Sequence, residues 1–223
     1  MKKLLFTLMA IVAAISFSAC SKDDGETWPD DSPIIEFKDS YFLEALVKST
    51  DNDDGSKIDK NGDGRISEKE ASVVKNLYVD DSGIRGIDEI GYFTALTSLS
   101  CGGNQLTSLD VSKNTALTSL SCGVNKLTSL DVSKNTALRS LDFDSNQITS
   151  LDVSKNTALT WLGCGGNPLT SLDVSKCKKL IKFNCFNNPS LKSIVIYKYY
   201  DSRLEYDLNT IIRKYGNIIT YKE

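Results

Sequence analysis

Histidine is absent from the 223-residue sequence, and basic residues do not outnumber acidic ones, since the net charge is −3. Without histidine, the chain cannot hold a Ser-His-Asp triad, a Cys-His pair or a histidine-ligated zinc ion. Its acidic balance argues against a general role in binding nucleic acid or anionic membranes. The sequence also lacks a recognisable set of nucleophile, base and catalytic metal ligands, so we predict that the chain is not an enzyme.

The first residues have the features of a secretory signal peptide. Two lysines precede the apolar residues 4–17, and small residues then lead to Cys20. Residues 1–19 are therefore predicted to be a signal peptide, too short to span a membrane in the mature protein. Residues 17–20 (Phe-Ser-Ala-Cys) resemble a lipobox, which implies that Cys20 is acylated and becomes the new N-terminus. An ordinary secretory signal followed by an unrelated cysteine is the alternative.

Residues 20–36 are predicted to form the lipidated N-terminus and a flexible tether. Within this stretch, residues 21–26 (Ser-Lys-Asp-Asp-Gly-Glu) resemble the export signal of Bacteroidetes-type surface lipoproteins. A plain solvated tether would have the same polarity. The resemblance implies an outer-membrane lipoprotein that is exposed at the cell surface and touches the membrane only through its lipid anchor.

A 21-residue repeat dominates residues 74–200. Its first half follows the pattern L-x-x-L-x-C-x-x-N-x-L, with a degenerate first copy at Val74 and an inserted residue in the last copy. The full copies begin at Leu96, Leu117, Leu138, Leu159 and Leu180. This pattern resembles the template of leucine-rich repeats position by position.

The repeat predicts a solenoid. Alternation of apolar and small polar residues, as in residues 99–101, indicates a short strand in each copy. Strands of successive copies would stack in parallel and shield one another's leucines, because one repeat cannot bury its apolar face alone. A 21-residue unit leaves no room for a helix behind the strand, so a short strand or extended turn is expected there. The predicted fold is a leucine-rich-repeat solenoid of stacked 21-residue coils with a parallel β-sheet and little helix in the repeats.

Repeated polar residues are expected to satisfy the turns of this solenoid. Asparagines such as Asn104 would turn the chain out of each strand and bond the backbone of neighbouring coils. A column of aspartates in the second half of each copy is expected to cap turn N–H groups rather than bind metal, since stacked like charges repel. The column comprises Asp110, Asp131, Asp152 and Asp173.

Four cysteines occupy one inward position of the repeat, the position that Phe143 fills in the middle copy. They are Cys101, Cys122, Cys164 and Cys185. Because a phenylalanine replaces them there, they are expected to be buried, free thiols. Disulfides between adjacent copies are the alternative, although parallel Cβ vectors suit them poorly. A linear ladder also spreads its sulfur atoms too widely to converge on one zinc ion.

Residues 59–70 match D-x-[DN]-x-[DN]-G-x5-E at every position and resemble an EF-hand loop. The resemblance implies calcium as a cofactor, with Arg65 contributing its carbonyl, Ser67 acting through water and Glu70 binding with both oxygens. The implied ligands are Asp59, Asn61, Asp63, Arg65, Ser67 and Glu70. A merely acidic turn is the alternative. Since the loop is single and its entering helix ends early, a structural clip is expected rather than a regulatory site.

Both ends of the solenoid are predicted to be capped. Residues 37–73 would form a helical N-terminal cap that contains the EF-hand-like loop. Its second helix would begin at Ser67 and present Ala71, Val74 and Leu77 on one face. Residues 201–223 would form an α/β C-terminal cap, with a helix that Gly216 ends and a closing strand.

Some outward strand residues depart from the small residues of the first copies. These candidate ligand-binding residues are Arg139, Asp142, Asp144, Trp161, Lys182, Asn184 and Phe186. Aromatic residues beside charges are typical of interaction hot spots and sugar-stacking platforms. Packing of Trp161 and Phe186 on the C-terminal segment is the alternative.

Taken together, these features resemble Bacteroidetes-type surface leucine-rich-repeat lipoproteins. The resemblance implies a monomeric, surface-anchored module that binds a host, matrix or cell-surface protein through its strand face. The alternative is a structural or accessory envelope lipoprotein that binds a glycan.

Overall fold

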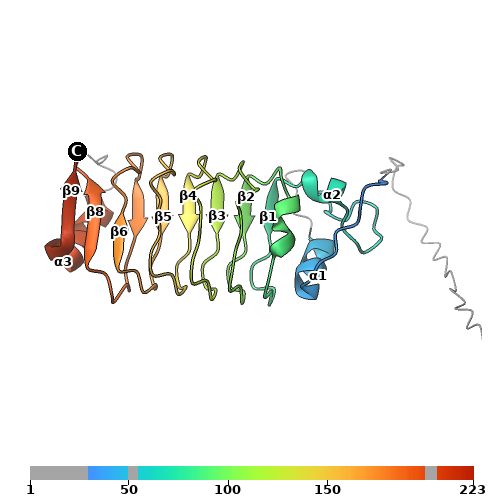
Figure 1. Cartoon of the computed structure of the whole chain (residues 1–223), viewed down its shortest axis with the longest axis horizontal. Helices are drawn as coiled ribbons and strands as arrows, with labels where there is room; N and C mark the ends of the chain where they lie inside the picture. The colour runs from blue at the N-terminus through green and yellow to red at the C-terminus, as the bar shows by residue number, and fades with distance from the viewer. Residues whose placement is uncertain (1–29, 50–54, 199–204) are drawn as a thin grey trace, which may run out of the picture.

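The computed structural model describes residues 30–49, 55–198 and 205–223. The predicted signal peptide, Cys20 and the acidic stretch after it lie outside these residues. The coils of the repeat follow one another along the longest axis of the molecule, with a cap at each end (Figure 1).

A six-stranded parallel sheet runs along one side of the solenoid in the order β1-β2-β3-β4-β5-β7. Each strand has three residues, and its central residue pairs with the equivalent residue of the next coil, as Leu99 pairs with Leu120. This register confirms the leucine-rich-repeat solenoid predicted from the 21-residue period. The strands are β1 (Asn76–Tyr78), β2 (Ser98–Ser100), β3 (Ser119–Ser121), β4 (Ser140–Asp142), β5 (Trp161–Gly163) and β7 (Lys182–Asn184).

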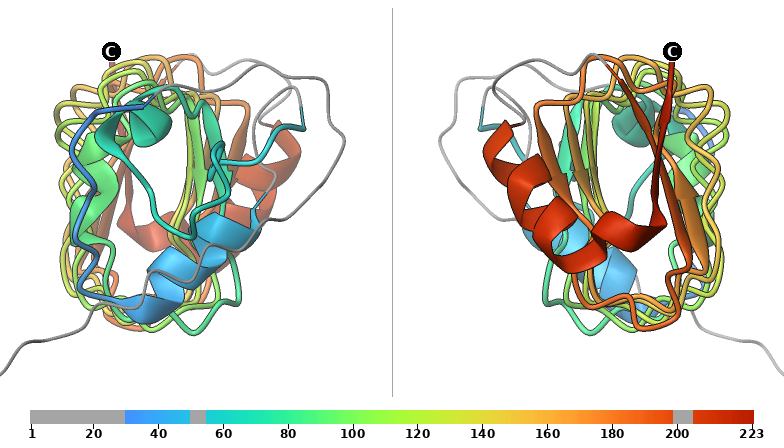
Figure 2. Two further views of the ribbon diagram at one scale, coloured as in Figure 1. Left: turned by 90° about the vertical axis from the view of Figure 1, so that its right-hand side faces the viewer. Right: turned by 90° about the vertical axis from the view of Figure 1, so that its left-hand side faces the viewer.

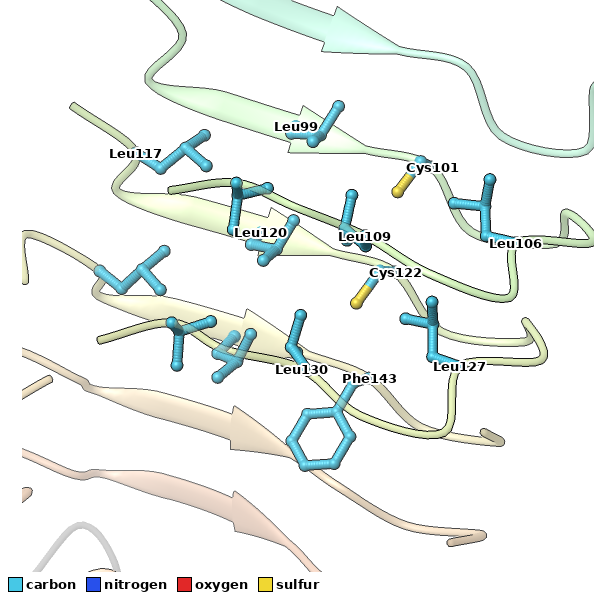
Figure 3. Packing of buried hydrophobic residues seen from close by; sticks show 14 of the residues in the cluster. Leu99, Cys101, Leu106, Leu109, Leu117, Leu120, Cys122, Leu127, Leu130 and Phe143 are labelled. Atoms are coloured by element: carbon cyan, nitrogen blue, oxygen red, sulfur yellow. The ribbon is translucent and has the colours of Figure 1, made fainter. Parts of the chain in front are cut away.

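The hydrophobic core fills the inside of the coils. Side chains such as Leu99, Leu120 and Phe143 point inward and meet leucines from the opposite half of the coil (Figure 3). Leu120 and Phe143 are fully buried. Complete burial of a leucine contributes about 1.5–3 kcal/mol, so stacking many such residues holds the solenoid together.

The opposite side of the coil is mostly extended chain without regular pairing. A second, three-stranded parallel sheet forms only near the C-terminus, in the order β6-β8-β9. It comprises β6 (Ser171–Asp173), β8 (Ser193–Tyr197) and β9 (Ile219–Lys222). Figure 2 looks along the solenoid and shows the two sheets on opposite sides of a flattened coil. The second half of each copy was expected to be a short strand or an extended turn, and both occur.

Two short helices and a 3-10 turn close the N-terminal end. They are α1 (Ser40–Lys48), α2 (Glu68–Ser72) and η1 (Asp88–Tyr92). Phe42 of α1 is fully buried, and its ring centroid lies 6.3 Å from that of Phe93. The helix predicted after Ser67 is shorter than expected. Leu77 lies in β1 rather than on the helix, because its pairing with Leu99 places it in the sheet.

The C-terminal end is closed by α3 (Glu205–Tyr215), η3 (Gly216–Ile218) and β9. Helix α3 ends immediately before Gly216, as the sequence predicts, and it contacts β7. The closing strand β9 pairs in parallel with β8. None of the helices in the described part of the chain is long and apolar enough to cross a membrane.

Candidate functional site

The outward face of the six-stranded sheet, here called the strand face, presents the residues that alternate with the buried leucines. On β2 and β3 these residues are small and half-buried, as Ser98 and Ser119 are, whereas β1 presents the exposed Tyr78. Toward the C-terminus they become larger: Asp142 lies on β4, Trp161 on β5, and Lys182 and Asn184 on β7. The structure therefore brings most of the predicted ligand-binding residues to one face.

A hollow of about 330 Å³ lies where the first coils leave their strands. We call it the aspartate hollow. Its lining combines four carboxylates, small residues and one exposed valine: Asp80, Asp81, Gly102, Gly103, Ser121, Gly123, Val124, Asp142 and Asp144. Sequence reasoning found Asp142 and Asp144 but missed Asp80 and Asp81. The signal was available, because Asp80 stands two residues before Ser82, as Gly102 stands two residues before Asn104.

One row of equivalent positions crosses the aspartate hollow and reads Asp80, Gly102, Gly123 and Asp144. Successive backbone bonds define this row, since Gly103 N–H donates to the Gly123 carbonyl and Val124 N–H to the Asp144 carbonyl. A Cβ on Gly102 would lie 3.1 Å from Asp80 Oδ1, so glycine fits the floor closely. The middle of this row is therefore formed by Gly102 and Gly123, and each end of the row is an aspartate.

Hydrogen bonds hold the carboxylates of the aspartate hollow in place. Asp80 Oδ1 accepts from Gly102 N–H at 2.6 Å and from the Ser100 hydroxyl at 2.7 Å. Asp144 Oδ1 accepts from Gly165 N–H at 2.5 Å. Both aspartates are therefore fixed by the following coil before any ligand arrives.

Asp144 is partly buried. Partial burial, assisted by the nearby negative charge of Asp142, raises its carboxyl pKa above 3.8. Gly165 N–H and Asn184 Nδ2, which donates to Asp144 Oδ2 at 2.8 Å, oppose this rise. The side chain of Asn184, one of the predicted ligand-binding residues, is thus engaged with Asp144.

Phe186 belongs to the C-terminal cap. Its ring stacks on Tyr215 with centroids 6.4 Å apart, and Lys214 Nζ lies 5.1 Å from its centroid. Packing on the C-terminal segment, one of the two expectations for this residue, is therefore confirmed. Trp161 is half-buried on β5, and Arg139 is exposed just before β4.

Two asparagine ladders support the strand face from within. In the first, Asn125 Oδ1 accepts Leu106 N–H, and its Nδ2 donates to the carbonyls of Cys101 and Cys122. The other members of this ladder are Asn104, Asn146, Asn167 and Asn188. This ladder confirms the predicted bonding between coils.

The second ladder lies on the opposite turn and is less complete. Asn135 Nδ2 donates to the carbonyls of Val111 and Asn114, but its buried Oδ1 has no hydrogen-bond partner among the described residues. Asn114 and Asn156 share this arrangement, and Cys177 takes the next position. The difference in completeness between the two ladders was not predicted from the sequence.

The aspartate column of the second half caps turns, as predicted. Asp131 Oδ1 accepts Ser133 N–H at 2.8 Å, and the same bond recurs in the other copies. The bonds from Ser133 lower the carboxyl pKa of Asp131. In the part of the chain that the structure describes, no three His, Cys, Asp or Glu side chains lie close enough to hold a metal ion.

All five cysteines among the described residues are free and buried. Burial raises the pKa of the Cys101 thiol to about 12. A thiol with so high a pKa is a poor nucleophile, so this ladder acts as apolar core, as the exchange with Phe143 predicts.

The predicted calcium loop adopts a compact turn. Asp59 is nearly buried, and its two carboxylate oxygens accept Gly62 N–H at 2.8 Å and Gly64 N–H at 3.0 Å. Gly62 and Gly64 both have positive φ angles, which glycine adopts without strain. Asn61 and Asp63 are exposed on the rim of the loop.

Glu70 connects the two ends of this loop. Its Oε1 accepts Lys60 N–H at 2.8 Å, and its Oε2 accepts Ser67 N–H at 2.9 Å. Ser67 in turn accepts Glu70 N–H, which completes a capping box at the start of α2. The sequence assigned Glu70 only to calcium and missed this second role. The loop supplies the oxygen ligands that a hard cation prefers, and in this structure they bond the loop's own N–H groups.

Comparisons with known proteins agree with the fold. The functional domain of InlJ from Listeria monocytogenes, a structure described as including a cysteine ladder, is 35% identical, with a TM-score of 0.57. The match covers 66% of this chain and 36% of that one. The internalin InlF from the same species is 21% identical, with a TM-score of 0.53, over 83% of this chain and 55% of that one. This second likeness shows the fold alone.

The chain thus spans about a third of the InlJ functional domain and about half of the InlF chain. A comparison with models of known protein families gives no match, and neither does a comparison with curated proteins. The register, the asparagine ladder and these solved structures together show that the chain has the leucine-rich-repeat fold.

Proposed function

We propose that the chain is a non-catalytic binding module that holds a protein partner on its strand face. The observation that carries the proposal is the aspartate hollow, a depression at the ends of the strands of the parallel sheet. Its side chains are held by the solenoid rather than by mobile loops, so little ordering cost would oppose binding. Solved leucine-rich-repeat structures such as the internalins support a role of this kind.

The proposal is tested by blocking one face at a time. The full chain is immobilised, and purified extracellular-matrix and cell-surface proteins are passed over it. Arginine replaces Ser98 and Ser119 on the strand face in one variant, and Ser108 and Ser129 on the opposite half in the other. A partner should lose at least tenfold in affinity with the first variant only. Equal effects from both variants would contradict the proposal.

We also propose that Cys20 carries the lipid that anchors the module at the cell surface. The support is the lipobox-like sequence before it. Cells producing the full chain with a radiolabelled fatty acid should yield a labelled protein, and Cys20→Ser should remove the label. Protease added to intact cells should then release the wild-type module; an unlabelled wild-type protein would contradict the anchor.

Calcium is proposed as a stabilising ion of residues 59–70. The support is the donor set of the motif, the oxygens of Asp59, Asn61, Asp63 and Glu70. In the structure the carboxylates among them do not converge, because those of Asp59 and Glu70 accept backbone N–H groups, so calcium would have to displace these bonds. When bound, calcium would neutralise these carboxylates and join the loop to α2. Adding calcium should raise the melting temperature of the wild type but not of Glu70→Gln, with Glu68→Gln, at an exposed neighbouring position, as the control. No shift in the wild type would leave Glu70 with its capping role alone.

Glycan binding is the second candidate function, and Trp161 is the observation that favours it. Its ring lies half-buried on the outward side of β5, beside Ser140 and Lys182 of the neighbouring strands. Stacking of a sugar on this ring should quench tryptophan fluorescence during titration with soluble glycans. Loss of the quenching in Trp161→Ala would favour this function, and an unchanged titration would reject it.

A further inference from the structure

The aspartate hollow carries negative charge that no neighbouring side chain balances. Among the salt bridges of the described residues, none includes Asp80, Asp81, Asp142 or Asp144. The carboxylates bond to N–H groups, a serine hydroxyl and an asparagine amide, and these donors bring no net positive charge. A surface that concentrates uncompensated charge in a depression attracts ligands of the opposite sign.

We propose that the aspartate hollow binds an extended, basic segment of the protein partner through two arginine or lysine side chains four residues apart. This inference rests on the proposed function, because it names the kind of partner that the strand face would take. The carboxylates at the two ends of the hollow would each receive one cationic side chain, with the peptide backbone lying over the glycine floor.

The spacing of the carboxylates determines the spacing in the ligand. Asp80 and Asp144 occupy equivalent positions three coils apart. Neighbouring parallel strands are separated by about 4.8 Å, so these positions are about 14 Å apart. An extended chain advances about 3.4 Å per residue, and residues i and i+4 point to the same side. Two basic residues four positions apart therefore match both the distance and the direction.

The floor of the hollow favours a peptide over a metal ion. Gly102, Gly123 and Ser121 leave its centre open between the acidic ends. The carboxylates do not converge, since the described residues contain no group of three metal-binding side chains. A guanidinium group can bond a carboxylate with two parallel hydrogen bonds, so arginine is the stronger ligand at each end.

Val124 adds an apolar contact to this surface. It lines the hollow, and 62% of its surface is exposed. Its side chain lies between the two acidic ends, in the coil before Asp144, where it would meet the uncharged residues between the two basic ones. The preferred segment is therefore basic at its ends and apolar between them.

The binding test uses fluorescently labelled synthetic peptides and the full chain. Gly-Arg-Ala-Val-Ala-Arg-Gly carries the two arginines four residues apart, and control peptides place them two or three residues apart or replace both with glutamate. Fluorescence anisotropy should show at least fivefold tighter binding of the first peptide, and raising the salt concentration should weaken it. Equal binding of the three arginine peptides, or none, would overturn the proposal.

Two variants place the peptide in the aspartate hollow. The double variant Asp80→Asn/Asp144→Asn should weaken binding at least tenfold, whereas Asp131→Asn/Asp152→Asn removes the same charge elsewhere and should change it less than twofold. Ser121→Lys should fill the hollow with an internal cation and abolish binding, with Ser129→Lys as its control. Equal losses in both double variants would mean that net charge alone attracts the peptide, which would also overturn the proposal.

Failure of the basic-segment proposal can be distinguished from failure of the proposed function. If arginine at Ser98 and Ser119 blocks a protein partner but the double variant Asp80→Asn/Asp144→Asn does not, the strand face binds proteins and the proposed basic segment is wrong. If neither change affects a bound partner, the strand face is not the binding surface, and both proposals are wrong.

Discussion

Asn125 bonds to Leu106 of the preceding coil, because Asn125 Oδ1 accepts Leu106 N–H at 3.0 Å. The same side chain donates from Nδ2 to three carbonyls, those of Cys101, Cys122 and Gly123. Asn125 therefore satisfies the backbone of two coils at once. Asn135, on the opposite turn, makes only the two donated bonds.

Alanine at these two asparagines should therefore have unequal effects. Asn125→Ala removes the Asn125 partner of Leu106 N–H and of the Cys101 and Cys122 carbonyls, whereas the Gly123 carbonyl still accepts Gly103 N–H. It should cost about 3–4 kcal/mol of unfolding free energy. Asn135→Ala loses two bonds but also removes an unsatisfied buried oxygen, so about 1–2 kcal/mol is expected. Urea unfolding measures both, with the exposed Gln147→Ala as the control. Equal losses would contradict the difference between the ladders.

Phe143 offers a test of how the cysteine ladder packs. It is fully buried at the position that cysteine occupies in the neighbouring coils, and its ring fills space that a thiol would leave empty. Phe143→Cys makes the repeat more regular but should cost about 2–4 kcal/mol, because a cavity remains. Phe143→Leu should cost less. Urea unfolding measures the stability of both variants. If Phe143→Cys does not lower the free energy of unfolding, the core closes around the smaller residue.

The period of the sequence was sufficient to predict the solenoid. Leucines that recur every 21 residues allow only one register of stacked strands, and Leu99 does pair with Leu120. The exchange of cysteine for Phe143 likewise indicated free, buried thiols. These features depend on local pattern and on the shielding of each coil by the next, so sequence reasoning reaches them.

Features that depend on contacts between different coils were harder to predict. The aspartate hollow joins Asp80 of the degenerate first repeat with Asp144 three coils later, and the weak first copy hid their equivalence. For Phe186 the sequence left both a ligand-binding role and packing on the C-terminal segment open, because its partner, Tyr215, lies in a segment outside the repeat. Glu70 fitted a calcium motif and a capping box equally well, since both need a glutamate at the same position.

Acid usually destabilises a folded protein, but protonation of Asp144 should stabilise this one. Its pKa is raised in the fold, so the folded state binds a proton more tightly than the unfolded chain does. As pH falls from neutrality through that raised pKa toward 3.8, protonation of Asp144 contributes stability, which is lost again as pH rises. Wild type should therefore gain stability relative to Asp144→Asn when the pH is lowered over this window.

Asp131 provides the control of opposite sign. Its pKa is lowered by hydrogen bonds from Ser133, so its contribution is present above 3.8 and is lost as pH falls through the lowered value. Carbon-detected NMR titration of the carboxyl groups should give Asp144 a higher pKa than Asp131. Urea midpoints at several pH values should show opposite trends for the two asparagine variants; parallel trends would contradict the burial of Asp144.

Val124 combines backbone strain with exposure. Its φ angle is 54°, in the left-handed region that β-branched residues avoid, whereas Gly103 and Gly166 take equivalent positions in other coils. Val124→Gly should relieve strain of about 1–3 kcal/mol, partly offset by the greater freedom of glycine in the unfolded chain. Urea unfolding should show a net gain of about 1 kcal/mol.

Lys126→Gly, at an exposed position outside the left-handed region, is the matched control for this gain and should destabilise the chain by up to about 1 kcal/mol. If Val124→Gly also destabilises the chain, the valine is not strained. The same variant should weaken binding of Gly-Arg-Ala-Val-Ala-Arg-Gly while it strengthens the fold. That combination would mean that Val124 contributes to peptide binding but lowers the stability of the fold, as strained residues at binding sites commonly do.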